Sequence, residues 1–83
     1  MKNVDITPAQ SRAARGLVGM TQVGLAKEAG LGQSTVIDFE RERREVSQAA
    51  REAVRAALEA AGVEFIPVNG GGAGVRLSKK NED

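Results

Sequence analysis

The sequence contains no cysteine and no histidine among its 83 residues. These absences exclude disulfide bridges, the usual zinc sites and catalysis by a histidine general base. The sequence also has no apolar run approaching the length that spans a membrane, and its N-terminus lacks the apolar stretch of a secretion signal. We therefore expect a small cytoplasmic domain that uses no metal and no cofactor.

Charge of one sign is also scarce, since the formal net charge is only +1 at pH 7. A strongly basic domain would indicate nucleic acid by its charge alone, and this one does not. The positions of the charges are more informative, because Arg41, Arg43 and Arg44 lie close together in the sequence. Such a cluster is either a solvated face or a set of phosphate contacts.

The sequence carries a regular series of helix signals. Thr7 followed by Pro8 predicts a helix start, because threonine caps free amide groups and proline suits the first helical position. We expect helices over residues 8–18, 21–29 and 33–40, and a fourth helix that follows a cap at Ser47. The expected apolar stripes are Ala13, Ala14 and Leu17 on the first helix and Ala50, Ala53, Val54, Ala57, Leu58 and Ala61 on the fourth.

After residue 62 the sequence changes to two short apolar runs around a glycine-rich turn. This pattern predicts a β-hairpin with strands near 63–66 and 74–77, followed by a disordered tail over 79–83. A lone hairpin is marginally stable in water, so we expect it to pack on the fourth helix or to pair with a second subunit. The glycine run lacks the lysine and the helix of a phosphate-binding loop. The candidate residues for a dimer interface are Val63, Phe65, Ile66, Val75 and Leu77.

The second and third expected helices have the spacing of a helix-turn-helix, which indicates binding to duplex DNA. Ala26 is small enough to let two helices approach closely at a steep angle, and Gly30 readily adopts the positive φ that ends a helix. Apolar residues of the third helix point inward and leave its opposite face clear of the body. The residues that carry this pattern are Leu25, Ala26, Ala29, Gly30, Leu31, Val36 and Phe39.

On these residues the chain resembles the Cro/cI-like (XRE) family of phage and bacterial repressors, from about residue 12 to residue 44 and less specifically beyond. The resemblance implies a mainly α, lambda-repressor-like helix-turn-helix bundle of about four helices over 1–62, here followed by the C-terminal hairpin over 63–78. Gly24 departs from the family pattern. A glycine within a helix costs roughly 0.5 to 1 kcal/mol relative to alanine.

Four residues on the outer face of the third helix are candidates for reading bases. Gln33 lies at the N-terminal end, which enters the major groove, and a glutamine amide can bond an adenine edge bidentately. The family uses a glutamine at the matching place, and the alternative is a solvent-exposed cap. Ser34 can donate or accept, and Asp38 either accepts from a cytosine amino group or repels phosphates. Ile37 either contacts a thymine methyl group or packs beneath a neighbouring loop.

The resemblance also implies phosphate contacts and one structural ion pair. Gln22, at the start of the second helix, matches the family position that binds a phosphate, and the alternative is an ordinary first-turn residue. Arg15 and Glu40 match a partly buried ion pair that ties the first helix to the end of the third. The remaining expected phosphate contacts are Thr35, Arg43 and Arg44.

The sequence therefore predicts a sequence-specific regulator of transcription that binds a palindromic operator in double-stranded DNA as a homodimer and acts as a repressor. The alternative is a protein-interaction module, or an antitoxin, whose hairpin binds a partner protein. A nucleoid-type protein without sequence preference is disfavoured by the weak net charge. The carboxylates are scattered and have no nucleophile nearby, so we expect no enzyme.

Overall fold

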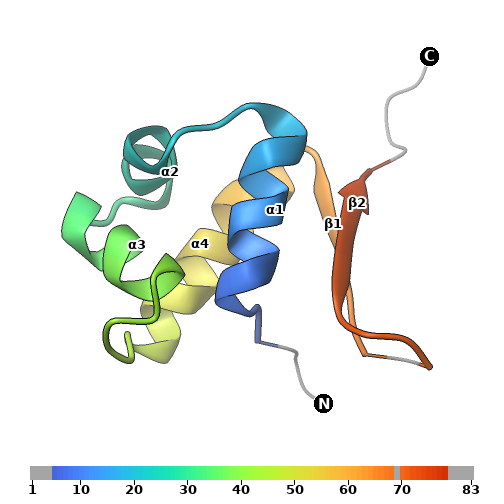
Figure 1. Ribbon diagram of the computed structural model, residues 1–83. Coiled ribbons are helices and arrows are strands. Elements are labelled where there is room, and N and C mark those ends of the chain that lie inside the picture. Colours follow the sequence, from blue (N-terminus) through green and yellow to red (C-terminus); the bar gives the residue numbers. More distant parts are fainter. Residues whose placement is uncertain (1–4, 69, 79–83) are drawn as a thin grey trace.

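The structure, a computed structural model, describes residues 5–68 and 70–78 and is mainly helical. The predicted disordered tail and Asn69 of the glycine-rich turn lie outside the described residues. The four predicted helices and the predicted hairpin are all present (Figure 1). The elements are α1 (Pro8–Val18), α2 (Gln22–Ala29), α3 (Gln33–Glu40), α4 (Gln48–Ala60), β1 (Val63–Ile66) and β2 (Gly74–Leu77).

Side-chain caps begin three of these four helices. The Thr7 hydroxyl accepts a hydrogen bond from the Gln10 amide at 3.0 Å, and the Gln10 side chain accepts one from the Thr7 amide at 2.9 Å, which is a capping box. Thr21 and Ser47 cap α2 and α4 more simply, each by accepting a hydrogen bond from a backbone amide through its hydroxyl oxygen. By contrast, Gly32 precedes α3 and has no side chain to cap it. The stability of α3 therefore depends on its packing against the other helices.

Three of the four helices end at a residue in a left-handed backbone conformation. α1 and α2 end on glycines with φ of 69° and 71°, as their sequences predict. α3 ends differently, because Glu42 has a φ of 58° and is the only non-glycine residue with a positive φ in the described ranges. The Glu42 amide donates to the Phe39 carbonyl at 3.1 Å and the Arg43 amide to the Asp38 carbonyl at 2.9 Å, the bond pair of a Schellman turn. The sequence contains no breaker here and predicted only a polar connection.

One hydrophobic core lies beneath all four helices and the hairpin. Ala14, Leu25, Val36 and Leu58 are fully buried, and Val63 of β1 is only 3 % exposed. The first strand of the hairpin therefore completes the same core as the helices. The other buried apolar residues are Ile6, Ala26, Phe39, Val46, Ala50 and Val54.

The predicted apolar stripe of α1 is wrong at two of its three positions. Ala14 is buried, but Ala13 is exposed and Leu17 is 42 % exposed. The buried positions beside Ala14 are instead the polar residues Gln10 and Ser11, each of which finds a hydrogen-bond partner across the fold.

The stripe of α4 is correct except at its end. Ala50, Val54 and Leu58 are buried, and Ala53 and Ala57 are partly buried. Ala61 is exposed because α4 stops at the preceding residue.

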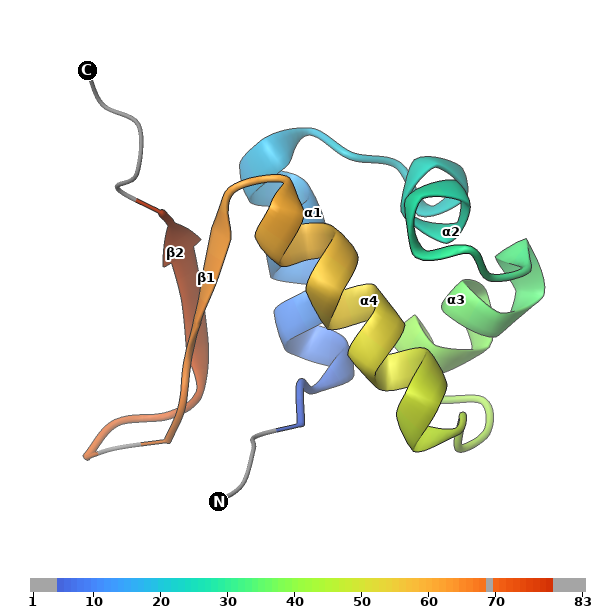
Figure 2. The ribbon, with the colours of Figure 1, turned by 180° about the vertical axis from the view of Figure 1, so that it is seen from behind.

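The hairpin packs against α1 and α4, on the side of the molecule away from α2 and α3 (Figure 2). Its strands pair antiparallel, with Phe65 opposite Val75, and both of these side chains pack against the core. The Gln10 side chain donates to the Gly74 carbonyl at 3.0 Å, and the Arg55 guanidinium lies 5.6 Å from the centre of the Phe65 ring. The hairpin therefore packs on its own helices.

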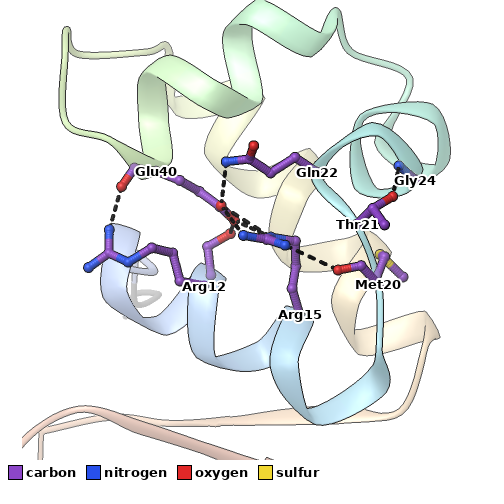
Figure 3. A network of polar contacts seen from close by, with 8 residues as sticks. Arg12, Arg15, Met20, Thr21, Gln22, Gly24 and Glu40 are labelled. Atoms are coloured by element: carbon purple, nitrogen blue, oxygen red, sulfur yellow. Dashed lines mark hydrogen bonds and ion pairs between the residues drawn. The ribbon is translucent and has the colours of Figure 1, made fainter.

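Glu40, the last residue of α3, is held by side chains from two other helices (Figure 3). Its side chain is fully buried, and Arg15 Nη2 of α1 lies 2.8 Å from its Oε1 atom, the expected ion pair. The hydroxyl of Ser11 donates to Oε2, and the Gln22 side chain of α2 donates to Oε1 at 3.0 Å. The Arg12 side chain donates to the Glu40 backbone carbonyl. One residue therefore sets where α3 ends relative to α1 and α2.

The pKa of Glu40 lies below its ordinary value. Burial by itself raises the pKa, because the charged form loses its hydration. Hydrogen bonds from Arg15, Ser11 and Gln22, together with the charge of Arg15, outweigh that effect. The ionised carboxylate is thus the form that the fold stabilises.

Glu40→Gln tests this arrangement. We expect a loss of about 3 to 5 kcal/mol of unfolding free energy at pH 7, because the substitution leaves the Arg15 charge without its partner. Since the folded-state pKa of Glu40 is lowered, its stabilisation is complete above the ordinary glutamate range and is lost as the pH falls through the folded pKa. Urea unfolding from pH 7 to pH 3 should therefore show the two proteins converging at acidic pH. A variant that matches the wild type at pH 7 would contradict this role.

Glu42→Gly tests the left-handed end of α3. A non-glycine residue in this conformation costs about 1 to 2 kcal/mol, part of which is offset because glycine loses more entropy on folding. We expect a gain of about 0.5 to 1 kcal/mol in unfolding free energy, measured by denaturant titration. Glu45→Gly is the matched control, because this exposed loop glutamate has an ordinary φ, and it should lose stability. Equal effects of the two substitutions would contradict the interpretation.

Candidate nucleic-acid interface

The α2 and α3 helices form the predicted helix-turn-helix. Leu25 and Val36 are fully buried in the core, and Ala26 is 1 % exposed. The Leu31 amide donates to the Ala26 carbonyl at 2.9 Å, so the chain turns sharply after Gly30. In Figure 1 these two helices stand at the end of the molecule opposite the hairpin. One face of α3 therefore remains on the surface.

The N-terminal end of α3 presents its side chains to solvent. Gln33 and Ser34 are exposed, whereas Thr35 and Ile37 are half-buried. Within the described part of the chain, the side chains of Gln33 and Ser34 have no hydrogen-bond partner. Their amide and hydroxyl groups are thus available to a ligand, as base reading requires.

Gln22 lies at the first position of α2, directly after the Thr21 cap. Its side chain is half-buried, and its amide nitrogen donates to Glu40 at 3.0 Å. A primary amide has two N–H donors, so this bond orients the group and uses one of them. Gln22 thus has a structural role, which is its hydrogen bond to Glu40. Its contact with a phosphate stays a prediction.

Asp38, Arg43 and Arg44 form one charged cluster at the C-terminal end of α3. Arg44 Nε donates to Asp38 Oδ2 at 2.8 Å, and Arg43 Nη1 lies 3.8 Å from Asp38 Oδ1. The sequence predicted these residues as separate contacts to bases and phosphates. The structure brings them together at the C-terminal end of α3, and their contacts to DNA stay predictions.

Sequence reasoning missed two polar residues of α1, Ser11 and Arg12, that hold the end of α3. Ser11 lies one helical turn before Arg15, so helical spacing already places both on the same face of α1. That spacing was the available signal for its contact with Glu40. The bond from Arg12 to the backbone carbonyl of Glu40 has no comparable signal, because it depends on how α1 and α3 cross.

Two other kinds of site are absent from the part of the chain that the structure covers. In residues 5–68 and 70–78 no three or more histidine, cysteine, aspartate or glutamate residues are arranged to hold a metal ion. None of the helices in these ranges combines the length and the apolar character needed to cross a membrane.

Comparison with known proteins agrees with this geometry. A family model described as helix-turn-helix matches residues 12–62, which is more than half of the chain and includes α2, α3 and α4. A comparison with curated proteins gives no match. The resemblance inferred from the sequence is confirmed, and the chain belongs to the Cro/C1-type (XRE) helix-turn-helix family of DNA-binding regulators.

Proposed function

We propose that this DNA-binding regulator is a repressor that recognises a palindromic operator as a homodimer, with α3 in the major groove of each half-site. The observation that carries the proposal is the contrast between the two ends of α3. Its last residue, Glu40, is locked into the body, while Gln33 and Ser34 at its start are exposed and without partners in the described chain. A rigidly held helix with open polar groups at its N-terminal end suits base reading. A regulator of this kind acts on DNA in the cytoplasm.

In this proposal the residues of α3 divide into base readers and flanking contacts. In a recognition helix the exposed residues near the N-terminus are the ones that contact base edges. Gln33 and Ser34 are the principal readers, and Ile37 and Asp38 lie one turn further along. Phosphate contacts from Gln22 of α2 and Thr35 of α3 would set the position of the helix in the groove.

The homodimer follows from the size of the reading surface. A single helix of eight residues contacts too few bases for specificity, and two copies read half-sites about 34 Å apart. Burial favours some of the predicted dimer residues over others. Val63 is buried in the core, and Phe65 and Val75 pack partly against the same core. Leu77 is 54 % exposed and Ile66 is half-buried, so we place the interface at these two residues.

Gln33→Ala tests base reading. Selection of bound sites from a random duplex pool at near-physiological salt should enrich an inverted repeat with the wild type, and the variant should lose or relax the preference at one position of each half-site. A bidentate contact of this kind is worth about 1 to 3 kcal/mol of discrimination. Gln48→Ala is the matched control, since this exposed glutamine lies at the start of α4, and it should select the same sites as the wild type.

The same selection can contradict the proposal. Identical preferences for the wild type and Gln33→Ala would show that this residue does not read bases. A wild type that enriches no sequence would exclude an operator and favour the alternative in which the hairpin binds a partner protein.

Leu77→Glu tests the dimer surface. The substitution places a charge at the exposed apolar position of β2, so we expect a folded monomer with weaker operator binding. Sedimentation equilibrium gives the oligomeric state. Val23→Glu is the control, because Val23 is 53 % exposed on α2, far from the hairpin, and the protein should remain a dimer. If Leu77→Glu sediments as a dimer, the hairpin is not the interface.

A further inference from the structure

The charged cluster at the end of α3 has one carboxylate between two guanidinium groups. Asp38 contacts Arg44 at 2.8 Å and Arg43 at 3.8 Å. The Asp38 side chain is 20 % exposed, whereas the two arginine side chains are 57 % and 53 % exposed. The arginines thus reach solvent while their charge is partly neutralised at the surface of α3.

The backbone holds this cluster together. After α3 the chain reverses through the left-handed residue Glu42, and the Arg43 amide donates to the Asp38 carbonyl at 2.9 Å. Residue 43 is therefore held over the last turn of α3, and the Arg44 side chain bonds to the same aspartate. A turn defined by backbone hydrogen bonds loses less entropy on forming the ion pairs than two free side chains would.

Helix stability does not explain an aspartate at this position. Asp38 lies in the last turn of α3, where the helix dipole is negative and disfavours an anion. A carboxylate facing DNA would also repel phosphates. The favourable contacts that Asp38 makes are with Arg43 and Arg44. The role of Asp38 therefore lies in its effect on these two arginines.

We propose that Asp38 restrains Arg43 and Arg44 against α3 and so weakens the part of DNA binding that does not depend on sequence. This inference rests on the proposed function. Non-specific binding comes from cations that neutralise phosphates, and one carboxylate lowers the charge of this cluster from two positive charges to one. Base contacts by Gln33 and Ser34 do not depend on that charge. Asp38 therefore lowers affinity for all sequences while the operator keeps its base-specific contribution.

Asp38→Asn tests the proposal. Dissociation constants are measured over a range of salt concentrations for the selected operator and for a scrambled duplex of the same length and composition. We expect the variant to bind the scrambled duplex several-fold more tightly, with a salt slope steeper by about 0.9 for each arginine released. The ratio of scrambled to operator dissociation constants should stay the same, because the phosphate contribution is common to the two duplexes. Adding Arg43→Gln and Arg44→Gln to Asp38→Asn should remove the increase in slope.

Glu59→Gln is the matched control for bulk charge. It removes a carboxylate from another exposed ion pair, in which Arg55 Nε lies 3.0 Å from Glu59 Oε2 on α4. The change in net charge equals that of Asp38→Asn, but Arg55 lies on the hairpin side of the molecule. We expect this variant to bind the scrambled duplex as the wild type does.

Three outcomes would overturn the role of Asp38. The first is an Asp38→Asn variant whose affinity and salt slope on the scrambled duplex equal those of the wild type. The second is an equal gain in Glu59→Gln, which would show an effect of net charge alone. The third is a selective loss of operator binding in Asp38→Asn, which would show that Asp38 reads a base directly. A wild type that selects no operator contradicts the proposed function instead, so the two failures are distinguishable.

Discussion

The structure depends on satisfying one buried carboxylate. Glu40 has no exposed side-chain surface, and a charge removed from water is tolerated only when opposite charge and hydrogen bonds replace its hydration. Arg15 and Ser11 supply these from α1, and Gln22 supplies another from α2. Any rotation of α3 away from these partners would leave a buried charge unpaired. The direction in which α3 faces is thus a consequence of electrostatics as well as of apolar packing.

Local signals in the sequence were sufficient to predict the secondary structure. Caps such as Thr7 and Ser47 and glycines that take positive φ act within a few residues, so they can be recognised without knowing the fold. The buried face of α1 could not be predicted in this way. Gln10 and Ser11 turn inward because the Gly74 carbonyl and the Glu40 carboxylate lie across from them, and both partners are distant in sequence.

In the candidate site, too, local signals were readable from the sequence and contacts that depend on the fold were not. Helical spacing was enough to place Gln33 and Ser34 on the outer face of α3. The contact between Asp38 and Arg44 depends on a glutamate in a left-handed conformation, for which the sequence has no characteristic residue. In the hairpin, the apolar runs of the sequence indicated an apolar face. Val63 is buried because the hairpin packs on α1 and α4, which the sequence did not establish.

The bond between Gln10 and Gly74 joins residues 64 positions apart. Contacts of such long sequence separation form late, because a long loop must close before they contribute. α1 makes this bond to β2 and also supplies Arg15 and Ser11 to Glu40 of α3. The attachment of the hairpin and the position of α3 are therefore linked through α1, so a change that detaches β2 would also loosen the support of Glu40.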